Sequence, residues 1–214
     1  MIAFRRRELI LGAALLAAGC SADSGAVAMS DADISVGETS APVTLIEYAS
    51  VTCPHCAEFH HQVWPQLKAN YIDTGRVHFV FREYPTPPAP IAVAGFQLAR
   101  CGGASPEQYF ERIGVLFEQQ QALFQALRAS GNAGARDKFL EIGAAAGLSN
   151  EQVLDCVSDE AGAARIRETV DAAHRDFDLT GTPTLILNGR KLEGVNIYNY
   201  DDVAAAIDAA ISGE

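Results

Sequence analysis

The sequence predicts an α/β protein whose central mixed sheet is built from a βαβ half and a ββα half, with a helical subdomain inserted between them. Three observations support this fold class. Within residues 43–84, two β-branched apolar segments flank a segment with helical spacing. A long region of helical periodicity follows. After it, residues 180–194 show the pattern of a β-hairpin ahead of a final amphipathic segment.

The βαβ half starts at residues 43–50, "VTLIEYAS", which predict a buried strand that runs directly into "VTCPHC". Pro54 suits the first turn of the next helix, where a missing N–H group costs nothing. The apolar face of this helix recurs every four residues, at Phe59, Val63, Leu67 and Tyr71. Residues 76–84, "RVHFVFREY", predict the second strand, which ends at the breaker run "PTPPAP".

The helical insertion is assigned to about residues 89–172, where amphipathic segments follow one another. Ser105, directly ahead of a proline, is typical of a helix start. Ser149 with Gln152 has the spacing of a capping box, in which each residue satisfies a free N–H group of the first turn.

The ββα half follows the insertion. Residues 180–194, "TGTPTLILNGRKLEG", predict a loop and two strands joined by an Asn-Gly turn. The last segment, "YDDVAAAIDAAI", predicts an amphipathic helix. Together these elements predict one domain over residues 37–214.

Residues 1–19 are typical of an export signal, with three arginines followed by an apolar run from Leu9 to Ala18 that is too short to span a bilayer. Arg6 and Arg7 resemble a twin-arginine motif, although an ordinary basic segment looks similar. "LAAGC" resembles a lipoprotein box and makes Cys20 a candidate for lipidation.

A second way of processing the N-terminus remains open, because cleavage after "AVA", which ends at Ala28, would release a soluble protein. Residues 20–36 are rich in Ser, Ala, Asp and Gly and predict a flexible tether. Removal of the signal takes away three arginines and one glutamate and changes the net charge from −11 to −13. Such a charge repels phosphate backbones, so nucleic-acid binding is excluded as a function.

The sequence contains five cysteines, and either route of signal processing removes Cys20 from thiol chemistry. In an oxidising compartment the remaining four predict two disulfides. Cys53 and Cys56 form one pair, which leaves Cys101 and Cys156 for each other. Two buried free cysteines remain the alternative for the second pair.

The close pair in "VTCPHC" could serve haem, metal or redox chemistry. Covalent haem attachment needs a histidine directly after Cys56, and this position is Ala57. A structural zinc site usually needs a second close pair of ligands, which is absent from the sequence. Copper or zinc handling by the two thiols with His60 or His61 remains an alternative, although these histidines are expected on the helix surface.

Redox chemistry needs only what this stretch contains. Cys53 stands at the start of a helix, where free N–H groups and the helix dipole stabilise a thiolate and lower its pKa. His55, between the two cysteines, adds positive charge and a hydrogen-bond donor beside that sulfur. Because a stabilised thiolate favours the reduced form, both effects make the disulfide more oxidising.

"APVTLIEYASVTCPHC" together with "GTPT" resembles the DsbA-like thiol–disulfide oxidoreductases of bacterial envelopes, which have a thioredoxin fold with a helical insertion. The resemblance covers about residues 37–212. It implies that Cys53 is the nucleophile, that Cys56 is its partner and that Pro54 and His55 tune the pair. Glu47 matches a buried acid of this family that accepts a proton from Cys56. A strand residue facing solvent is the alternative for Glu47.

The resemblance also assigns Thr182 and Pro183 to a cis-proline loop that binds extended substrates. Thr182 replaces the valine of the best-known oxidases and is more frequent in isomerases, so the strength of the oxidant stays open. Some DsbA-like branches have a second, non-catalytic disulfide in the inserted helices, and Cys101 and Cys156 resemble it.

The function that follows from the resemblance is that of a monomeric dithiol oxidase in the periplasm or cell envelope. It would need no cofactor, act on exported proteins that contain cysteines, and be re-oxidised by a membrane oxidase of the DsbB type. A lipid on Cys20 would anchor it to a membrane. A disulfide isomerase or reductase of the same fold is the nearest alternative.

Overall fold

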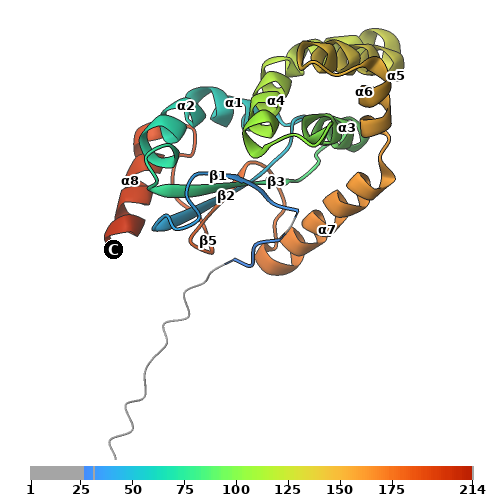
Figure 1. Ribbon diagram of the computed structural model, residues 1–214. Coiled ribbons are helices and arrows are strands. Elements are labelled where there is room, and N and C mark those ends of the chain that lie inside the picture. The colour runs from blue at the N-terminus through green and yellow to red at the C-terminus, as the bar shows by residue number, and fades with distance from the viewer. Residues whose placement is uncertain (1–26, 31, 214) are drawn as a thin grey trace, which may run out of the picture.

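The computed structural model describes residues 27–30 and 32–213, which form a mixed five-stranded sheet surrounded by helices (Figure 1). The strand order is β1-β3-β2-β4-β5. The strands are β1 (Ile34–Val36), β2 (Val43–Ala49), β3 (Val77–Glu83), β4 (Thr184–Leu187) and β5 (Arg190–Lys191). β2 and β3 are parallel, and the other neighbours are antiparallel. The predicted fold class is therefore confirmed.

Helices flank this sheet and form the insertion. They are α1 (Pro54–Gln62), α2 (Trp64–Leu67), α3 (Ala89–Arg100), α4 (Pro106–Glu118), α5 (Gln120–Ala145), α6 (Asn150–Val157), α7 (Glu160–Phe177) and α8 (Tyr200–Ser212), with a π-helical turn at Lys68–Ile72. Figure 1 shows α3 to α6 gathered beside the sheet and α7 returning toward it. No helix within residues 27–30 and 32–213 is long and apolar enough to cross a membrane.

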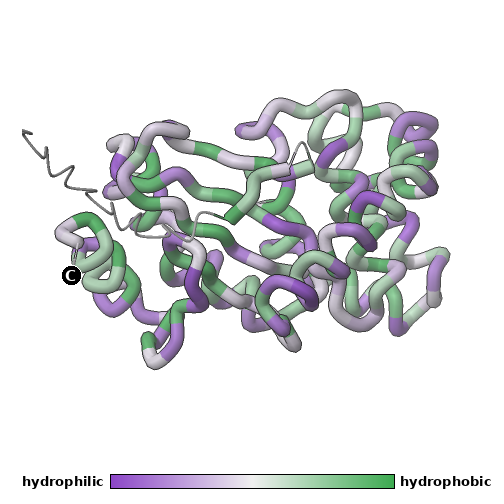
Figure 2. The backbone as a smooth tube through the Cα atoms, turned by 90° about the horizontal axis from the view of Figure 1, so that it is seen from below, coloured by the Kyte–Doolittle hydropathy of each residue, from purple (hydrophilic) through white to green (hydrophobic). Residues whose placement is uncertain are grey.

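The two faces of the sheet have separate cores, because successive strand residues point to opposite sides. One face, with Leu45 and Phe79, packs against α1 and the helical insertion. The other face, with Ile46 and Val80, packs against the end of α7 and Leu179. In Figure 2 the strands in the middle of the molecule are largely hydrophobic, and most hydrophilic stretches lie on the outer helices and turns.

The flexible tether predicted for residues 20–36 extends too far along the chain, because its last residues form a strand. The structure places Ile34–Val36 in β1, antiparallel to β3. The carboxylate of Asp33, directly ahead of this strand, is buried and accepts two hydrogen bonds of 2.8 Å from the buried guanidinium of Arg82. Because a buried guanidinium needs a charged partner, this ion pair holds the segment against the sheet. The predicted signal, residues 1–19, and residues 20–26 of the tether lie outside the described residues.

The helix after Pro54 is also more broken than the apolar spacing predicts. Its apolar face is buried as expected, but it runs over α1, α2 and the π-helical turn. α1 ends at Gln62, and Pro65 follows in the first turn of α2. A proline inside a helix removes one hydrogen bond and displaces the preceding turn, which accounts for the break.

Local signals farther along the chain predict the structure well. Ser105 and Ser149 both form capping boxes at the starts of α4 and α6. Asn188 and Gly189 have φ values of 45° and 84°, which suit the tight turn between β4 and β5. The insertion extends beyond residue 172, because α7 continues to Phe177.

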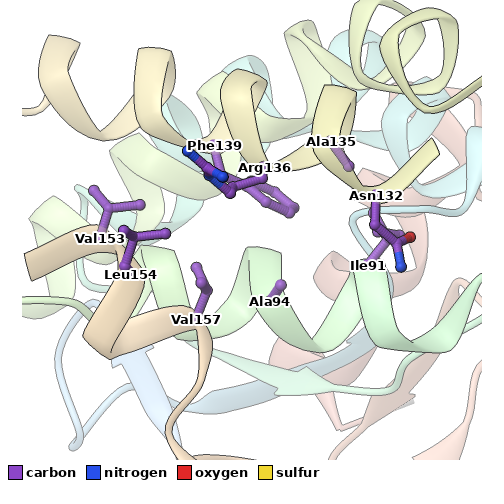
Figure 3. Close-up of a pocket in the computed structure, with 9 residues that line it drawn as sticks. All are labelled: Ile91, Ala94, Asn132, Ala135, Arg136, Phe139, Val153, Leu154 and Val157. Carbon is purple, nitrogen blue, oxygen red and sulfur yellow. The ribbon is translucent and has the colours of Figure 1, made fainter. Parts of the chain in front are cut away.

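The inserted helices are joined to one another at both the covalent and the packing level. A disulfide between Cys101 and Cys156 links the end of α3 to α6, so the alternative of two free thiols is wrong. An apolar cavity of about 150 Å³ lies between α3, α5 and α6. Figure 3 shows Phe139, Val153 and Val157 among its lining side chains. None of the lining residues belongs to the predicted redox site.

Candidate active site

The two thiols lie where β2 passes through a short turn into α1. Cys53 is the N-cap of α1, and Pro54 occupies the first helical position as predicted. The backbone N–H of Cys56 donates to the Cys53 sulfur over 3.4 Å. Both cysteines are free and buried, with 7% of Cys53 and 0% of Cys56 exposed to solvent. Cys53 is therefore the more accessible of the two sulfurs.

The thiols are electrostatically unlike. A hydrogen bond from the Cys56 thiol, helped by the Thr182 hydroxyl and by backbone N–H groups of Cys56 and His55, lowers the pKa of Cys53 to about 5. Burial raises the pKa of Cys56 far above its usual value, and the hydrogen bond to Cys53 adds to this. At neutral pH Cys53 is thus a thiolate and Cys56 a thiol.

Glu47 lies on β2, near enough for its charge to act on both thiols, and is only 3% exposed, which excludes the alternative of a carboxylate facing solvent. Its Oε1 atom has no hydrogen-bond partner in the part of the chain that the structure describes. Burial, followed by the negative charge on Cys53, raises the pKa of Glu47 to about 8. The carboxyl group therefore keeps its proton at neutral pH.

The loop before β4 also contacts Cys53. The peptide bond between Thr182 and Pro183 is cis. The carbonyl oxygen of Thr182 lies 3.3 Å from the Cys53 sulfur. The Thr182 hydroxyl is buried and has no hydrogen-bond partner among the described residues, so its proton is available to the thiolate. Thr182 thus contacts the reactive sulfur directly.

Two of the three histidines near the cysteines, His55 and His60, differ from their predicted positions. The side chain of His55 is 68% exposed and points to Glu58, 3.5 Å from its Nδ1 atom, so its contribution to the Cys53 pKa comes from its backbone N–H. His61 is exposed as predicted. His60 is half-buried: its ring stacks on Trp64 at 5.6 Å between centroids and lies 5.0 Å from Phe117. Burial lowers the pKa of His60 to about 4.

The position of His60 follows from how α4 packs on α1. Gly114 of α4 lies against the imidazole, and a Cβ atom there would come within 3.2 Å of His60 Nε2.

Across residues 27–30 and 32–213, no three His, Cys, Asp or Glu side chains gather as a metal site would require.

Two hydroxyl groups beside the cysteines, those of Ser50 and Thr52, are missing from the sequence prediction. The Thr52 hydroxyl lies 2.9 Å from the Ser50 hydroxyl and donates to the Thr86 carbonyl over 2.9 Å. The Thr86 N–H in turn donates to the Ser50 hydroxyl over 3.1 Å. This network ties the turn before Cys53 to the loop that follows β3. The segment "SVTC" contains the hydroxyls, but the sequence alone does not identify their partner.

Gln120 is a second residue that the sequence prediction missed. It begins α5 in the helical insertion and is 7% exposed. Its Nε2 group donates to the carbonyl oxygens of Val51 and Cys53 over 2.8 Å and 3.1 Å. It stands in the run "QQQ", where nothing distinguishes the buried glutamine from its neighbours.

Known proteins are similar to this chain in sequence and in fold. A family model described as Thioredoxin matches residues 29–209. A protein named protein-disulfide oxidoreductase in Rickettsia prowazekii (strain Madrid E) is 28% identical over 184 residues, which cover 86% of this chain and 63% of the relative. The chain thus spans less than two thirds of the length of that relative.

Two solved structures show the same architecture. The crystal structure of Wolbachia pipientis alpha-DsbA1 superposes with a TM-score of 0.73 at 24% identity, covering 85% of this chain and 92% of that one. The protein-disulfide isomerase from Novosphingobium aromaticivorans gives a TM-score of 0.71 at 22% identity, with coverages of 86% and 99%. The chain belongs to the thioredoxin family, in the DsbA-like form with inserted helices.

Proposed function

We propose that this chain is a thiol–disulfide oxidoreductase, and most specifically a dithiol oxidase that introduces disulfides into exported proteins. The observation that carries the proposal is the difference between the two thiols, with the pKa of Cys53 lowered to about 5 and that of Cys56 raised. A thiolate that is stable in the reduced protein makes the corresponding disulfide a stronger oxidant.

The reaction starts from the oxidised form, in which Cys53 and Cys56 are joined. A substrate thiolate attacks the more accessible Cys53 sulfur, and the bond to Cys56 breaks with its electron pair on Cys56. A second substrate thiolate then attacks the substrate sulfur of the mixed disulfide and releases Cys53 as a thiolate. Two electrons pass from the substrate to the enzyme, and the substrate leaves with a new disulfide.

Glu47 has a role in the first of these steps. Cys56 leaves as a thiolate in an apolar environment that strongly disfavours its charge, so it takes up a proton. Glu47 is near enough to Cys56 for its charge to act on that thiol, and with a pKa of about 8 it holds a proton at neutral pH. It donates this proton to Cys56 during substrate oxidation and takes up another from solvent, so that both groups are protonated in the reduced protein. When Cys56 attacks again, Glu47 first releases its proton to solvent and then accepts the one on Cys56.

The setting of the reaction belongs to the same proposal. The signal-like residues 1–19 and the disulfide between Cys101 and Cys156 both suit an oxidising cell envelope. Cys20 would be lipidated unless cleavage occurs near Ala28. A membrane oxidase of the DsbB type would accept the two electrons and restore the disulfide. The chain would act as a monomer.

The reduction potential tests the oxidase function. The disulfide between Cys53 and Cys56 is equilibrated with glutathione buffers, and its potential is expected well above the thioredoxin value of about −270 mV. Wild-type protein should also oxidise a dithiol peptide stoichiometrically, and Cys53→Ser should not. A potential near that of thioredoxin would contradict the oxidase function and leave a reductase.

A disulfide isomerase is the second candidate, and Thr182 favours it, because the residue before the cis-proline is more frequently threonine in isomerases and valine in the best-known oxidases. The Novosphingobium relative in fold is also titled a protein-disulfide isomerase. Refolding of a protein with scrambled disulfides separates the two activities. An isomerase in its reduced form restores the activity of the scrambled protein, whereas an oxidase acts on a substrate only in its oxidised form.

A further inference from the structure

One buried side chain of the helical insertion reaches the backbone that carries the reactive sulfur. Gln120 lies at the junction of α4 and α5, where Gln119 ends one helix and caps the next. Its amide spans the carbonyls of Val51 and Cys53, which stand on either side of Thr52. The hydrogen bonds to Val51 and Cys53 connect residues that are 69 and 67 positions apart in the sequence.

These two carbonyls belong to the turn that precedes α1. The turn is closed by the Cys53 N–H, which donates to the Ser50 carbonyl over 3.0 Å. Val51 is 1% exposed. Within residues 27–30 and 32–213, the Gln120 amide is the only donor to the Val51 carbonyl. Because a buried carbonyl without a partner is costly, the turn would move if this amide were removed.

The same backbone sets the surroundings of the Cys53 sulfur. The Cys53 carbonyl accepts a hydrogen bond from Gln120 and also one of 3.2 Å from the Ala57 N–H, the first of α1. Its orientation therefore determines where the first turn of α1 lies. That turn includes the Cys56 N–H, which donates to the Cys53 sulfur. A shift of this carbonyl would move the donor away from the thiolate.

The turn is held from two sides. On one side, the Thr52 hydroxyl binds Ser50 and Thr86, which both belong to the sheet-bearing part of the chain. On the other side, the Gln120 amide comes from the inserted helices. We propose that Gln120 is a positioning residue for thiol–disulfide exchange, which holds the turn before α1 so that the Cys53 thiolate receives the N–H groups of the helix start. This inference rests on the proposed function.

A matched control exists in the same helices. Gln97 of α3 is also buried, at 4% exposure, and its Nε2 group donates to the carbonyl of Asp159, at the start of α7. Gln97→Met and Gln120→Met each remove a buried amide that binds a backbone carbonyl while keeping the length of the side chain. Of these two glutamines, only Gln120 contacts the turn at Cys53. If Gln120 had only a structural role, both variants would lower stability and neither would change the chemistry of Cys53.

The experiment measures the rate of alkylation of Cys53 against pH in the reduced protein, together with the glutathione equilibrium of the Cys53–Cys56 disulfide. Gln120→Met is expected to shift the midpoint of the alkylation profile upward by about one pH unit and the equilibrium about tenfold toward the disulfide. Gln97→Met is expected to lower stability to urea without moving either quantity. Gln120→Glu, which keeps the shape but presents no donor when ionised, should shift both quantities in the direction of Gln120→Met.

The proposal would be overturned if Gln120→Met left the midpoint and the equilibrium unchanged, or if Gln97→Met moved them equally. A measurement on unaltered protein covers the case in which neither Gln120 variant folds. The side-chain amide protons of Gln120 should exchange slowly with solvent, and rapid exchange in the folded protein would refute the two hydrogen bonds.

Failure of the proposed function gives a different result. A wild-type protein without thiol–disulfide exchange would refute that function, while the alkylation profile would still report whether Gln120 positions Cys53. Exchange in the wild type combined with unchanged variants would refute the role of Gln120 alone.

Discussion

Replacing Glu47 with glutamine should remove a large pH dependence of stability from the oxidised protein. In the unfolded chain this carboxyl group ionises near its ordinary pKa of 4.5, whereas burial raises the pKa to about 8 in the folded protein. Between these values the folded state binds one proton more than the unfolded state. The free energy of unfolding therefore falls as pH rises, by about 1.4 kcal/mol per pH unit.

The size of the effect follows from the width of this interval. Across the whole interval between the two pKa values, ionisation of Glu47 lowers the free energy of unfolding by about 4 to 5 kcal/mol. Between about pH 5.5 and about pH 7.5 it lowers this free energy by about 2 to 3 kcal/mol. Oxidation of the two thiols takes away the charge on Cys53, but burial is the larger cause of the shift, so most of the slope remains. Glu47→Gln has no proton to lose and should lack this slope.

Urea unfolding of oxidised wild-type and Glu47→Gln protein, followed by the fluorescence of the single tryptophan, Trp64, measures the effect. The absolute stability of the variant also reflects the new amide group, so the difference in slope is the informative quantity. Glu118→Gln, which removes an exposed negative charge, controls for net charge. If the difference in free energy between wild type and Glu47→Gln were the same at every pH, the carboxyl group would not be neutral in the folded protein.

Three further outcomes are expected. Thr182→Val removes the hydroxyl donor beside the Cys53 sulfur and should raise the pKa of Cys53 above about 5, and an unchanged alkylation midpoint would contradict the contact. Cys53 ionises above about pH 5 and Cys56 does not, so reduction of the disulfide should take up one proton above this pH and two below it. The reduction potential should therefore fall by about 30 mV per pH unit above about pH 5 and by about twice as much below it. A slope of about 60 mV per pH unit at every pH would refute the low pKa of Cys53. Replacing Cys101 and Cys156 by alanine opens a loop with a separation of 55 residues and should lower the free energy of unfolding in urea by about 4 kcal/mol, and an unchanged value would show that the bridge does not constrain the unfolded chain.

The parts of the fold that the sequence predicted are those with local signals. β2 runs into Cys53, Pro54 opens α1, and the Asn188 turn joins β4 to β5, each within a few residues of the pattern that predicts it. Alternation of side chains, capping and turn conformation are properties of neighbouring residues, so one sequence suffices to recognise them.

The features that the sequence did not predict depend on distant partners. β1 has three residues, too few for a periodic pattern, and it is held by Asp33 against Arg82, 49 positions away. Gln120 binds the Cys53 carbonyl, 67 positions away in the sequence. His60 packs against Phe117 of α4, and no local pattern predicts where α4 lies. Residue type indicated that each of these groups is polar, but only the tertiary structure shows which of them is buried.

Glu47 and Cys53 together explain why the reduced site is stable with one charge. Their pKa values, about 8 and about 5, lie in the reverse of the usual order for a carboxyl and a thiol. The negative charge on Cys53 raises the pKa of Glu47, so a second charge in the same low-dielectric pocket is suppressed. In the reduced protein the two groups have opposite effects on stability, because the thiolate stabilises the fold as pH rises through the range in which the carboxyl group destabilises it. Oxidation removes the thiolate and leaves the carboxyl group alone, which is why the large pH slope predicted for Glu47 should appear in the oxidised protein and be largely cancelled in the reduced one.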